Sequence, residues 1–494
     1  MIYQNPIIRG FNPDPSICAA EGKYYLVTSS FQFFPGVPIY ESEDLVNWKK
    51  IGHVLTRHSQ VHLENVPSSG GVFAATIRYY QGRYYMTTTN NSTRQHFIVW
   101  TDDVYGEWSE PVVIDQDGID PSLLFDQGKV YFTSNGEDDY GVPGIVQCEI
   151  DIASGKKLTP SKTIWQGTGG RYLEGPHLYH IGNDYYIFAS EGGTEYGHMI
   201  TYARSKHPYG PFEPYQHNPI LTNRNLGGFD IQAVGHGDLV QDKYGDWFMI
   251  HLGFRQIGRW LPFHHLGRET FLTPVFRDED GWFTAGHQGT TIEVFEKKGE
   301  GKQTFIKHYM FNNIDTKLDW YYLRKPLLNH YNIHKDHVIL HGSNIHLNQP
   351  LSPTFIGLKQ AEFNAIITCD VTIDHGEGGL VIYMDENHHY DLLLQEHAQH
   401  VDAIAHIKIG SISHIQNRKQ IKNNHATLVI VATPNDYTFY VGDIKPENLL
   451  ANMETRYVSS EVALGFTGVF IGLYAYGKEK LNTVKFERLT IDYQ

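Results

Sequence analysis

The sequence predicts an all-β chain, in which a five-bladed β-propeller over residues 1–295 is followed by a β-sandwich over residues 303–494. Three observations predict this architecture. The composition favours strands and tight turns, with 13% aromatic residues and 47 glycines among 494 residues. A turn-and-strand pattern occurs five times before residue 290. A charged stretch at 296–302, which we interpret as a linker, ends this repeat, and the later strand-like runs are irregularly spaced.

Each copy of the repeat has a turn residue, a polar residue and two strand-forming residues, followed by a short apolar run. The five copies lie at 22–25, 82–85, 128–131, 183–186 and 245–248. They are 46 to 62 residues apart, which is enough chain for about four short strands. Turns of this kind between strand-like runs are typical of hairpins. Five such units in a row therefore predict the five blades of a propeller.

Acidic residues stand at matching positions of three repeats. Asp14 and Asp120 each precede the turn glycine of their repeat by eight residues, and Glu174 precedes Gly182 by the same interval. The first strand of each blade lines the central channel of a propeller, so these three side chains should converge in one pocket. Asp-Pro-Ser sequences are also common turn formers. Because the second repeat has alanines here, at 74–75, we favour a functional interpretation over a purely structural one.

Converging carboxyl groups predict glycoside hydrolysis. One protonated carboxyl group and one carboxylate, placed on opposite sides of a glycosidic bond, are the usual catalysts of that reaction. A third carboxylate nearby raises the pKa of the acid and keeps it protonated near neutral pH. Because the groups come from different blades, they have room for a water molecule between them, which favours the inverting mechanism.

Composition and charge exclude several other classes of protein. The net charge of −15 argues against nucleic acid or an anionic membrane as a partner. The sequence contains no run of about 20 apolar residues. The three cysteines, Cys18, Cys148 and Cys369, are too far apart for a disulfide framework or a zinc site. The first residues lack the basic and apolar regions of a secretory leader, so we expect a cytoplasmic protein.

The second half of the chain is rich in histidine as well as in strand-like runs. The histidines include His388, His389, His397, His400 and His406. A metal site would use such residues, but their spacing matches no tight ligand motif. We therefore favour the interpretation that these histidines alternate along an exposed sheet face.

Longer motifs resemble glycoside hydrolase family 43, and most closely its β-xylosidase and α-L-arabinofuranosidase branch. They span the first half of the chain in order, at 11–16, 29–31, 34–38, 118–122, 172–177, 236–239 and 266–270. The second half is similar to the concanavalin-like β-sandwich that follows the propeller in that branch. The chain departs from the family pattern in two places. Residues 73–75 are Phe-Ala-Ala, where family members often have Trp-Ala-Pro. Residues 236–239 are His-Gly-Asp-Leu, where family members often have His-Ala-Asp-Leu.

The resemblance implies a role for each catalytic carboxyl group. Asp14 is expected to be the general base that activates water, and Glu174 the general acid that protonates the leaving oxygen. Asp120 is expected to tune the pKa of Glu174 and to hold it in place. His236 is expected on the channel axis, as a metal ligand where some members bind a calcium ion or as a buried structural histidine. No cofactor is expected to be required.

The resemblance also implies four substrate-binding residues. Arg268 is expected to hydrogen-bond the terminal sugar, and Phe31 to form one wall of its subsite. Phe73 retains an aromatic wall in place of the usual tryptophan, without the indole N–H. Phe466, in the sandwich sequence 465–468, resembles a loop that closes the pocket in related enzymes.

The expected activity is that of an exo-acting, inverting glycosidase that releases terminal xylose from the non-reducing end of β-1,4-xylo-oligosaccharides. The enzymatic alternative is an α-L-arabinofuranosidase, or an enzyme with both activities. A non-catalytic sugar-binding propeller and a glycoside phosphorylase are further alternatives, although Arg268 alone is thin support for a phosphate pocket. The expected partner is a small oligosaccharide, and we expect a homo-oligomer.

Overall fold

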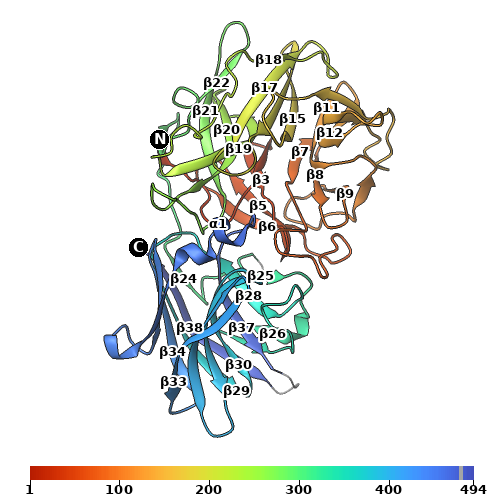
Figure 1. The fold of residues 1–494 in the computed structure, drawn as a ribbon. Coiled ribbons are helices and arrows are strands. Elements are labelled where there is room, and N and C mark those ends of the chain that lie inside the picture. Colours follow the sequence, from red (N-terminus) through yellow and green to blue (C-terminus); the bar gives the residue numbers. More distant parts are fainter. Residues whose placement is uncertain (317, 478–481) are drawn as a thin grey trace.

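The computed structural model describes residues 1–316, 318–477 and 482–494 and contains two domains (Figure 1). The N-terminal domain is a ring of five four-stranded sheets, and the C-terminal domain is a sandwich of two eight-stranded sheets. The predicted propeller and sandwich are both confirmed. In the described residues no helix is long and apolar enough to cross a membrane; the α-helix α1 (Ser460–Ala463) has only four residues.

The strands of each blade follow the chain from the channel outward, apart from one short strand that leaves the first blade. Blade one contains β2 (Ser16–Ala20), β3 (Lys23–Val27), β5 (Gly36–Ser42) and β6 (Lys49–Leu55). Blade two contains β7 (Thr76–Tyr80), β8 (Arg83–Asn90), β9 (Gln95–Thr101) and β10 (Val112–Ile114). Blade three contains β11 (Ile119–Asp126), β12 (Lys129–Glu137), β13 (Pro143–Glu149) and β14 (Lys162–Trp165).

The last two blades repeat the same order. Blade four contains β15 (Glu174–Ile181), β16 (Asp184–Glu191), β17 (Met199–Ser205) and β18 (Glu213–Pro214). Blade five contains β19 (Ile231–Gln241), β20 (Trp247–Arg255), β21 (Glu269–Arg277) and β22 (Phe283–Ala285). After the fifth blade, β23 (Val294–Glu296) pairs with β1 (Ile2–Gln4), so the end of the propeller sequence returns to its beginning.

The repeated glycines form the tight turns that the sequence predicts. In the first blade Glu21 and Gly22 have φ values of 52° and 80° and join β2 to β3. The same pair of left-handed residues occurs at 81–82 and 127–128. Two consecutive left-handed residues are typical of the two-residue turns whose twist matches antiparallel strands, and glycine adopts the second position without strain.

The sandwich sequence begins with β24 (His308–Met310). Its sheets also include one short strand from the propeller sequence. One sheet has the order β26-β27-β38-β29-β34-β35-β36, with β24 beside β38; these strands are β26 (Tyr331–Ile333), β27 (His337–His341), β38 (Thr483–Tyr493), β29 (Ala365–Asp374), β34 (His425–Ala432), β35 (Asp436–Val441) and β36 (Leu449–Glu454). The other has the order β33-β32-β31-β30-β37-β28-β25-β4; these are β33 (Ile412–Ile421), β32 (Val401–Ile409), β31 (His388–Glu396), β30 (Glu377–Asp385), β37 (Phe470–Tyr476), β28 (Thr354–Lys359), β25 (Tyr321–Leu323) and β4 (Phe33–Phe34).

The two domains share a sheet and a hydrophobic core. Strand β4 belongs to the propeller sequence but pairs with β25 of the sandwich, with Phe34 opposite Tyr322. Around this strand, Phe11, Phe31 and Phe33 pack with sandwich residues in one buried cluster. The ring of Phe33 stacks on Phe470 at a centroid distance of 4.0 Å. The sandwich is therefore anchored beside the first blade.

The interpretation of the sandwich histidines as an exposed row is wrong for two of them. His388 and His389 lie in β31 with 8% and 2% of their surface exposed. His388 forms a hydrogen bond with the buried Asp385, and His389 forms one with the buried Asp391. Hydrogen bonding to these carboxylates is what allows the imidazoles to be buried.

Candidate active site

The inner strands present their first residues to the channel through local irregularities. The pairing of β11 with β12 shifts between Ile119 and Ser122, and the pairing of β15 with β16 shifts between Glu174 and His177. The pairing of β19 with β20 shifts twice between residues 232 and 238. A β-bulge re-aims a side chain at the end of a strand. Three blades therefore direct side chains to one end of the channel.

Left-handed backbone occurs at three of the residues near this end of the channel. The φ values are 52° at Asp14, 54° at Asp120 and 51° at His236. Such values are uncommon for residues other than glycine and cost free energy, so the surrounding structure must hold them in place. Backbone strain of this kind gathers at functional sites.

Asp14 is a buried carboxylate held by two hydrogen bonds. Arg268 Nη1 donates to Asp14 Oδ1 at 2.7 Å, and Ser29 Oγ donates to Asp14 Oδ2 at 2.5 Å. Burial alone would raise the pKa of Asp14, but Arg268, His236 and the Ser29 hydrogen bond together outweigh it and lower the pKa below its ordinary value. Asp14 is therefore ionised at neutral pH.

Asp120 and Glu174 have the opposite electrostatics. Burial, with the negative charges of Glu174 and Asp14, raises the pKa of Asp120 to about 7. Burial and the charge of Asp14 raise the pKa of Glu174 to about 7 as well, although His236 and Arg268 act against this. The two groups interact and titrate as a pair, so one proton is retained between them near neutral pH. The backbone N–H of Gly175 donates to Asp120 Oδ2 at 3.1 Å and ties the two inner strands together.

His236 lies among the three carboxyl groups and is 4% exposed. Its positive form would lower the pKa of Asp14, Asp120 and Glu174 alike, which places its ring near all of them. A calcium ion takes six to eight oxygen ligands. In the described part of the chain, His236 belongs to none of the groups of three metal-ligating side chains that lie close together. The residues present form no calcium cage, and we derive no catalytic step through an ion.

Arg268 lies beside aromatic rings from both domains. Its guanidinium carbon is 5.6 Å from the centre of the Phe31 ring and 5.8 Å from that of Phe466. These two rings stack on each other at 6.2 Å, and Phe73 lies 5.4 Å from Phe31. Arg268 Nη2 also donates to the backbone oxygen of Phe466 at 3.2 Å. The structure thus brings together all four side chains that the family resemblance indicates for substrate binding.

A pocket of about 630 Å³ opens at this end of the propeller. Glu174 and Arg268 form part of its wall, together with Tyr172 and Tyr196 from blade four. The sandwich closes one side with residues from α1 and the loop after it: Ser460, Glu461, Leu464, Gly465 and Phe466. Both domains therefore contribute to the wall of the pocket.

Hydrogen bonds from the propeller hold the sandwich loop in place. Glu461 accepts from Tyr196 Oη at 2.8 Å and from the backbone N–H of His264 at 3.0 Å, and it pairs with the His264 ring at 2.8 Å. Ser69 Oγ accepts from the backbone N–H of Phe466 at 2.8 Å. Gly468 packs against the backbone of residues 266–267 so closely that a Cβ atom would collide with the Leu266 oxygen.

Two polar residues of the site were not identified from the sequence. His198 is fully buried, and its Nε2 lies 3.5 Å from Glu174 Oε1. Burial, with the charge of Arg268, lowers the pKa of His198 to about 4, so this ring is neutral. Thr194 Oγ1 accepts from Arg268 Nη1 at 3.0 Å. Both come from the segment between β16 and β17, which carries no part of the repeat and so offers no sequence signal.

Comparison with known proteins agrees with this architecture. The sequence model of the Glycosyl hydrolases family 43 matches residues 3–283. The model of the beta xylosidase C-terminal concanavalin A-like domain matches residues 308–492. The two matches together cover the propeller and the sandwich.

Individual relatives match over the whole chain. A non-reducing end alpha-L-arabinofuranosidase of Bacteroides ovatus is 38% identical over 97% of this chain and 92% of its own length. A xylosidase/arabinosidase of Butyrivibrio fibrisolvens is 33% identical over 100% and 99%. A solved structure described as the Bacteroides ovatus xyloglucan PUL GH43B superposes with a TM-score of 0.92 at 36% identity, covering 100% of both chains. The chain is a glycoside hydrolase and belongs to family 43, with that family's propeller and its concanavalin-like C-terminal domain.

Proposed function

We propose that this enzyme is an inverting exo-glycosidase that releases terminal xylose from the non-reducing end of β-1,4-xylo-oligosaccharides. The observation that carries the proposal is the division of protonation between Glu174, which lines the pocket, and Asp14, which is buried beside it and bonded to the pocket residue Arg268. Asp14 has a lowered pKa and is ionised, whereas burial raises the pKa of Glu174 to about 7. A base and an acid that face one substrate in these states can catalyse glycoside hydrolysis near neutral pH.

In the proposed mechanism each carboxyl group has one task. Asp14 takes a proton from a water molecule, whose oxygen then attacks the anomeric carbon. Glu174 gives its proton to the glycosidic oxygen as the bond to the leaving sugar breaks. Asp120 keeps a proton on the Asp120–Glu174 pair until that moment, because two neighbouring carboxyl groups cannot easily both ionise. Direct attack by water inverts the configuration at the anomeric carbon.

Arg268 and the aromatic rings would position the terminal sugar. Arg268 lines the pocket together with Glu174, so its guanidinium would donate a hydrogen bond to a sugar hydroxyl bound there. Phe31, Phe73 and Phe466 supply apolar surface beside it. The sandwich loop closes one side of the pocket, which supports exo action, because a polymer chain could not pass through.

A second candidate substrate is an α-L-arabinofuranoside. The observation that favours it is the 38% identity with the Bacteroides ovatus arabinofuranosidase over nearly the whole chain. Xylopyranose and arabinofuranose present similar hydroxyl patterns, so one pocket can accept both. The relative from Butyrivibrio fibrisolvens has both activities in its name.

The test is the initial rate of the purified protein on 4-nitrophenyl β-D-xylopyranoside and on 4-nitrophenyl α-L-arabinofuranoside, with Asp14→Ala as the control. A dominant xyloside rate is the expected result. A dominant arabinoside rate would replace it with the second candidate. If the folded protein hydrolysed neither substrate and only bound oligosaccharides, the sugar-binding alternative would take its place. NMR of the first-formed anomer tests inversion separately.

We further propose that the enzyme acts in the cytoplasm on short oligosaccharides. The three cysteines are buried and free, which is compatible with a reducing compartment. Cell fractionation of the native host tests this location, and recovery of the activity outside the cell would contradict it. We also propose a homo-oligomer, which light scattering after size exclusion would check.

A further inference from the structure

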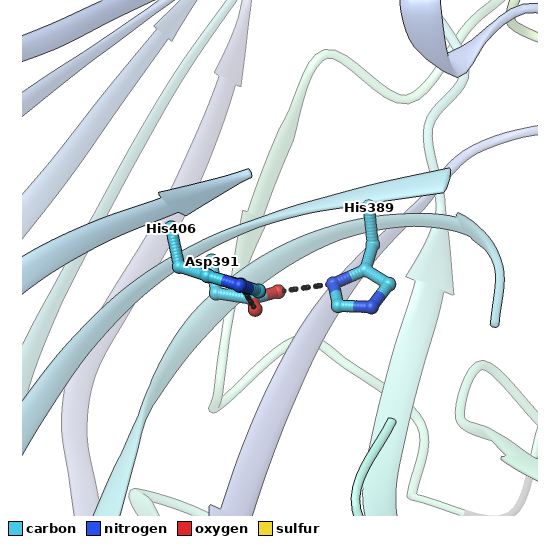
Figure 2. A group of neighbouring side chains, drawn as sticks. All are labelled: His389, Asp391 and His406. Atoms are coloured by element: carbon cyan, nitrogen blue, oxygen red, sulfur yellow. Dashed lines mark hydrogen bonds and ion pairs between the residues drawn. The ribbon is translucent and has the colours of Figure 1, made fainter. Parts of the chain in front are cut away.

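A polar cavity lies in the sandwich, lined by residues other than those of the active-site pocket. Its volume is about 260 Å³, and β30, β31, β32 and β33 contribute to its wall. Three of its lining residues, His389, Asp391 and His406, gather around one point (Figure 2). No step of the proposed hydrolysis uses them.

Asp391 is the centre of this cluster. His389 Nδ1 lies 2.7 Å from Asp391 Oδ1, and His406 Nδ1 lies 2.8 Å from Asp391 Oδ2. Figure 2 shows the carboxylate between the two imidazole rings. His389 and Asp391 are 2% and 4% exposed, and the His406 side chain is 21% exposed. The three residues are paired across two neighbouring strands, since Asp391 of β31 lies opposite His406 of β32.

We propose that His389, Asp391 and His406 bind a divalent transition-metal ion of the zinc class. Two imidazole nitrogens and one carboxylate oxygen are the donor set that zinc, nickel and cobalt favour, whereas calcium and magnesium prefer oxygen alone. Three protein ligands leave a fourth position for water. The cavity beside the cluster has room for that water and offers the ion a way in.

The groups around the cluster are arranged as they are around a bound metal ion. His406 Nε2 lies 2.9 Å from Ser413 Oγ, so its second nitrogen has the kind of partner that orients a metal-binding histidine. His389 Nε2 is buried without a hydrogen-bond partner among the described residues, so its ring is held only through Nδ1, the atom that faces Asp391. All three ligands stand on paired strands, where side-chain positions are well defined.

Charge in the cavity also favours a cation. Glu377 of β30 lines the same cavity and accepts a hydrogen bond from Gln395 at 2.7 Å. Its carboxyl group and that of Asp391 are buried close enough for each charge to act on the other. Lys408 of β32 is near enough to repel a positive His406, but the two carboxylates attract a divalent ion more strongly than one lysine repels it.

Protons compete with the ion for the same site. Without metal, the Nδ1 atoms and the Asp391 oxygens share protons at hydrogen-bond distances. With metal bond lengths of about 2.0–2.2 Å, neighbouring ligand atoms of a tetrahedral site lie roughly 3.3–3.6 Å apart, so the cluster must open by roughly 0.5–0.9 Å. Binding therefore releases protons, and the affinity for the ion should fall as the pH is lowered.

A second group, His397, His400 and Asp402, provides a matched control. It has the same residue types, but its two histidines lie at the turn between β31 and β32, and their side chains are 34% and 37% exposed. Exposed side chains at a turn lose more conformational freedom on binding than side chains already fixed on strands. We therefore assign the ion to the buried cluster.

The experiment titrates Zn²⁺ into the full-length protein after dialysis against EDTA, using calorimetry at pH 7.5 and pH 6, with Co²⁺ absorption as a second readout. We expect one ion per chain, weaker binding at pH 6 and the absorption of tetrahedral Co²⁺. His406→Gln and Asp391→Asn should weaken binding at least tenfold. The double variant His397→Gln/His400→Gln should bind like the wild type.

His406 is partly exposed, so His406→Gln should keep its fold and its hydrolysis rate, which circular dichroism and activity verify before titration. Three results would each overturn the proposal: no stoichiometric binding by the wild type, binding lost only in the His397→Gln/His400→Gln variant, or binding lost in Asp14→Ala but kept in His406→Gln. The last result would place the ion in the active-site pocket.

Discussion

Arg268 Nη1 lies 2.7 Å from Asp14 Oδ1, and this ion pair links the proposed general base to the junction of the two domains. The same guanidinium donates to the backbone of Phe466 in the sandwich and lies near both the Phe31 and Phe466 rings. Asp14 is thereby kept ionised by a residue whose own position depends on the sandwich. This arrangement connects the sandwich to Asp14 through one side chain.

Replacing Arg268 should change the acid side of the pH profile. Arg268 lowers the pKa of Asp14, so Arg268→Gln should raise that pKa and move the acid limb of kcat/KM to higher pH. We also expect kcat/KM at pH 7 to fall by roughly 10²-fold, because a charged hydrogen bond is lost. Arg268→Lys keeps the charge and should move the limb less. An unchanged limb in Arg268→Gln would show that Asp14 is not the group that titrates there.

The alkaline side of the profile should follow the pair of Asp120 and Glu174. If Glu174 is the general acid, activity should fall above about pH 7, where Glu174 loses its proton. Asp120→Asn removes a neighbouring negative charge, so the pKa of Glu174 should drop and the alkaline limb should move to lower pH. The exposed Asp115→Asn serves as a control for general charge effects. If the alkaline limb of the pH–activity profile did not move in Asp120→Asn, the coupling of Asp120 and Glu174 would be contradicted.

The close contact at Gly468 should be necessary for tight packing of the sandwich against the propeller. A Cβ atom there would meet the Leu266 backbone, so Gly468→Ala should destabilise the protein by roughly 1–3 kcal/mol. Displacing residue 468 would also move Phe466, which lines the pocket two residues earlier. The variant should therefore have a raised KM, with a smaller effect on kcat. Gly227→Ala is the control, because nothing lies within 4 Å of its Cβ position. Equal melting temperatures and KM values for the two variants would argue against a tight junction.

The wall at Phe73 should affect which pentose is preferred. Phe73 lies beside Phe31, and Phe73→Trp would enlarge this wall and add an indole N–H. We expect the ratio of xyloside to arabinoside turnover to change at least threefold, with both rates measured on 4-nitrophenyl glycosides. Tyr105→Phe, at an exposed aromatic residue of the propeller surface, should leave the ratio as it is. If Phe73→Trp also left it unchanged, this wall would not select the sugar.

The propeller was predictable from the sequence because its blade pattern repeats. Each blade needs a tight turn, and glycine at 22, 82 and 128 marks it. Asp14, Asp120 and Glu174 stand at one interval before a turn glycine, so the topology alone indicates that they converge. Arg268 and Phe466 carry no repeat signal, and only the resemblance to family 43 indicated them.

Features that depend on long-range packing were not predictable. His198 and Thr194 reach the site from an irregular segment between strands. The pairing of β4 with the sandwich depends on how two domains fit together, which no local pattern specifies. The burial of His389 was missed because its partner Asp391 compensates for the loss of water, and a sequence pattern does not show that pairing.

The most direct test of the acid and base roles is the effect of the leaving group. The measurement is kcat/KM of Glu174→Ala and Asp14→Ala on an aryl pentoside and on the matching disaccharide. An activated aryl leaving group needs little protonation, so Glu174→Ala should lose less than about tenfold on the aryl substrate and 10²–10⁴-fold on the disaccharide. Asp14→Ala should lose a similar, large factor on both. Equal losses in Glu174→Ala on the two substrates would contradict its role as the general acid.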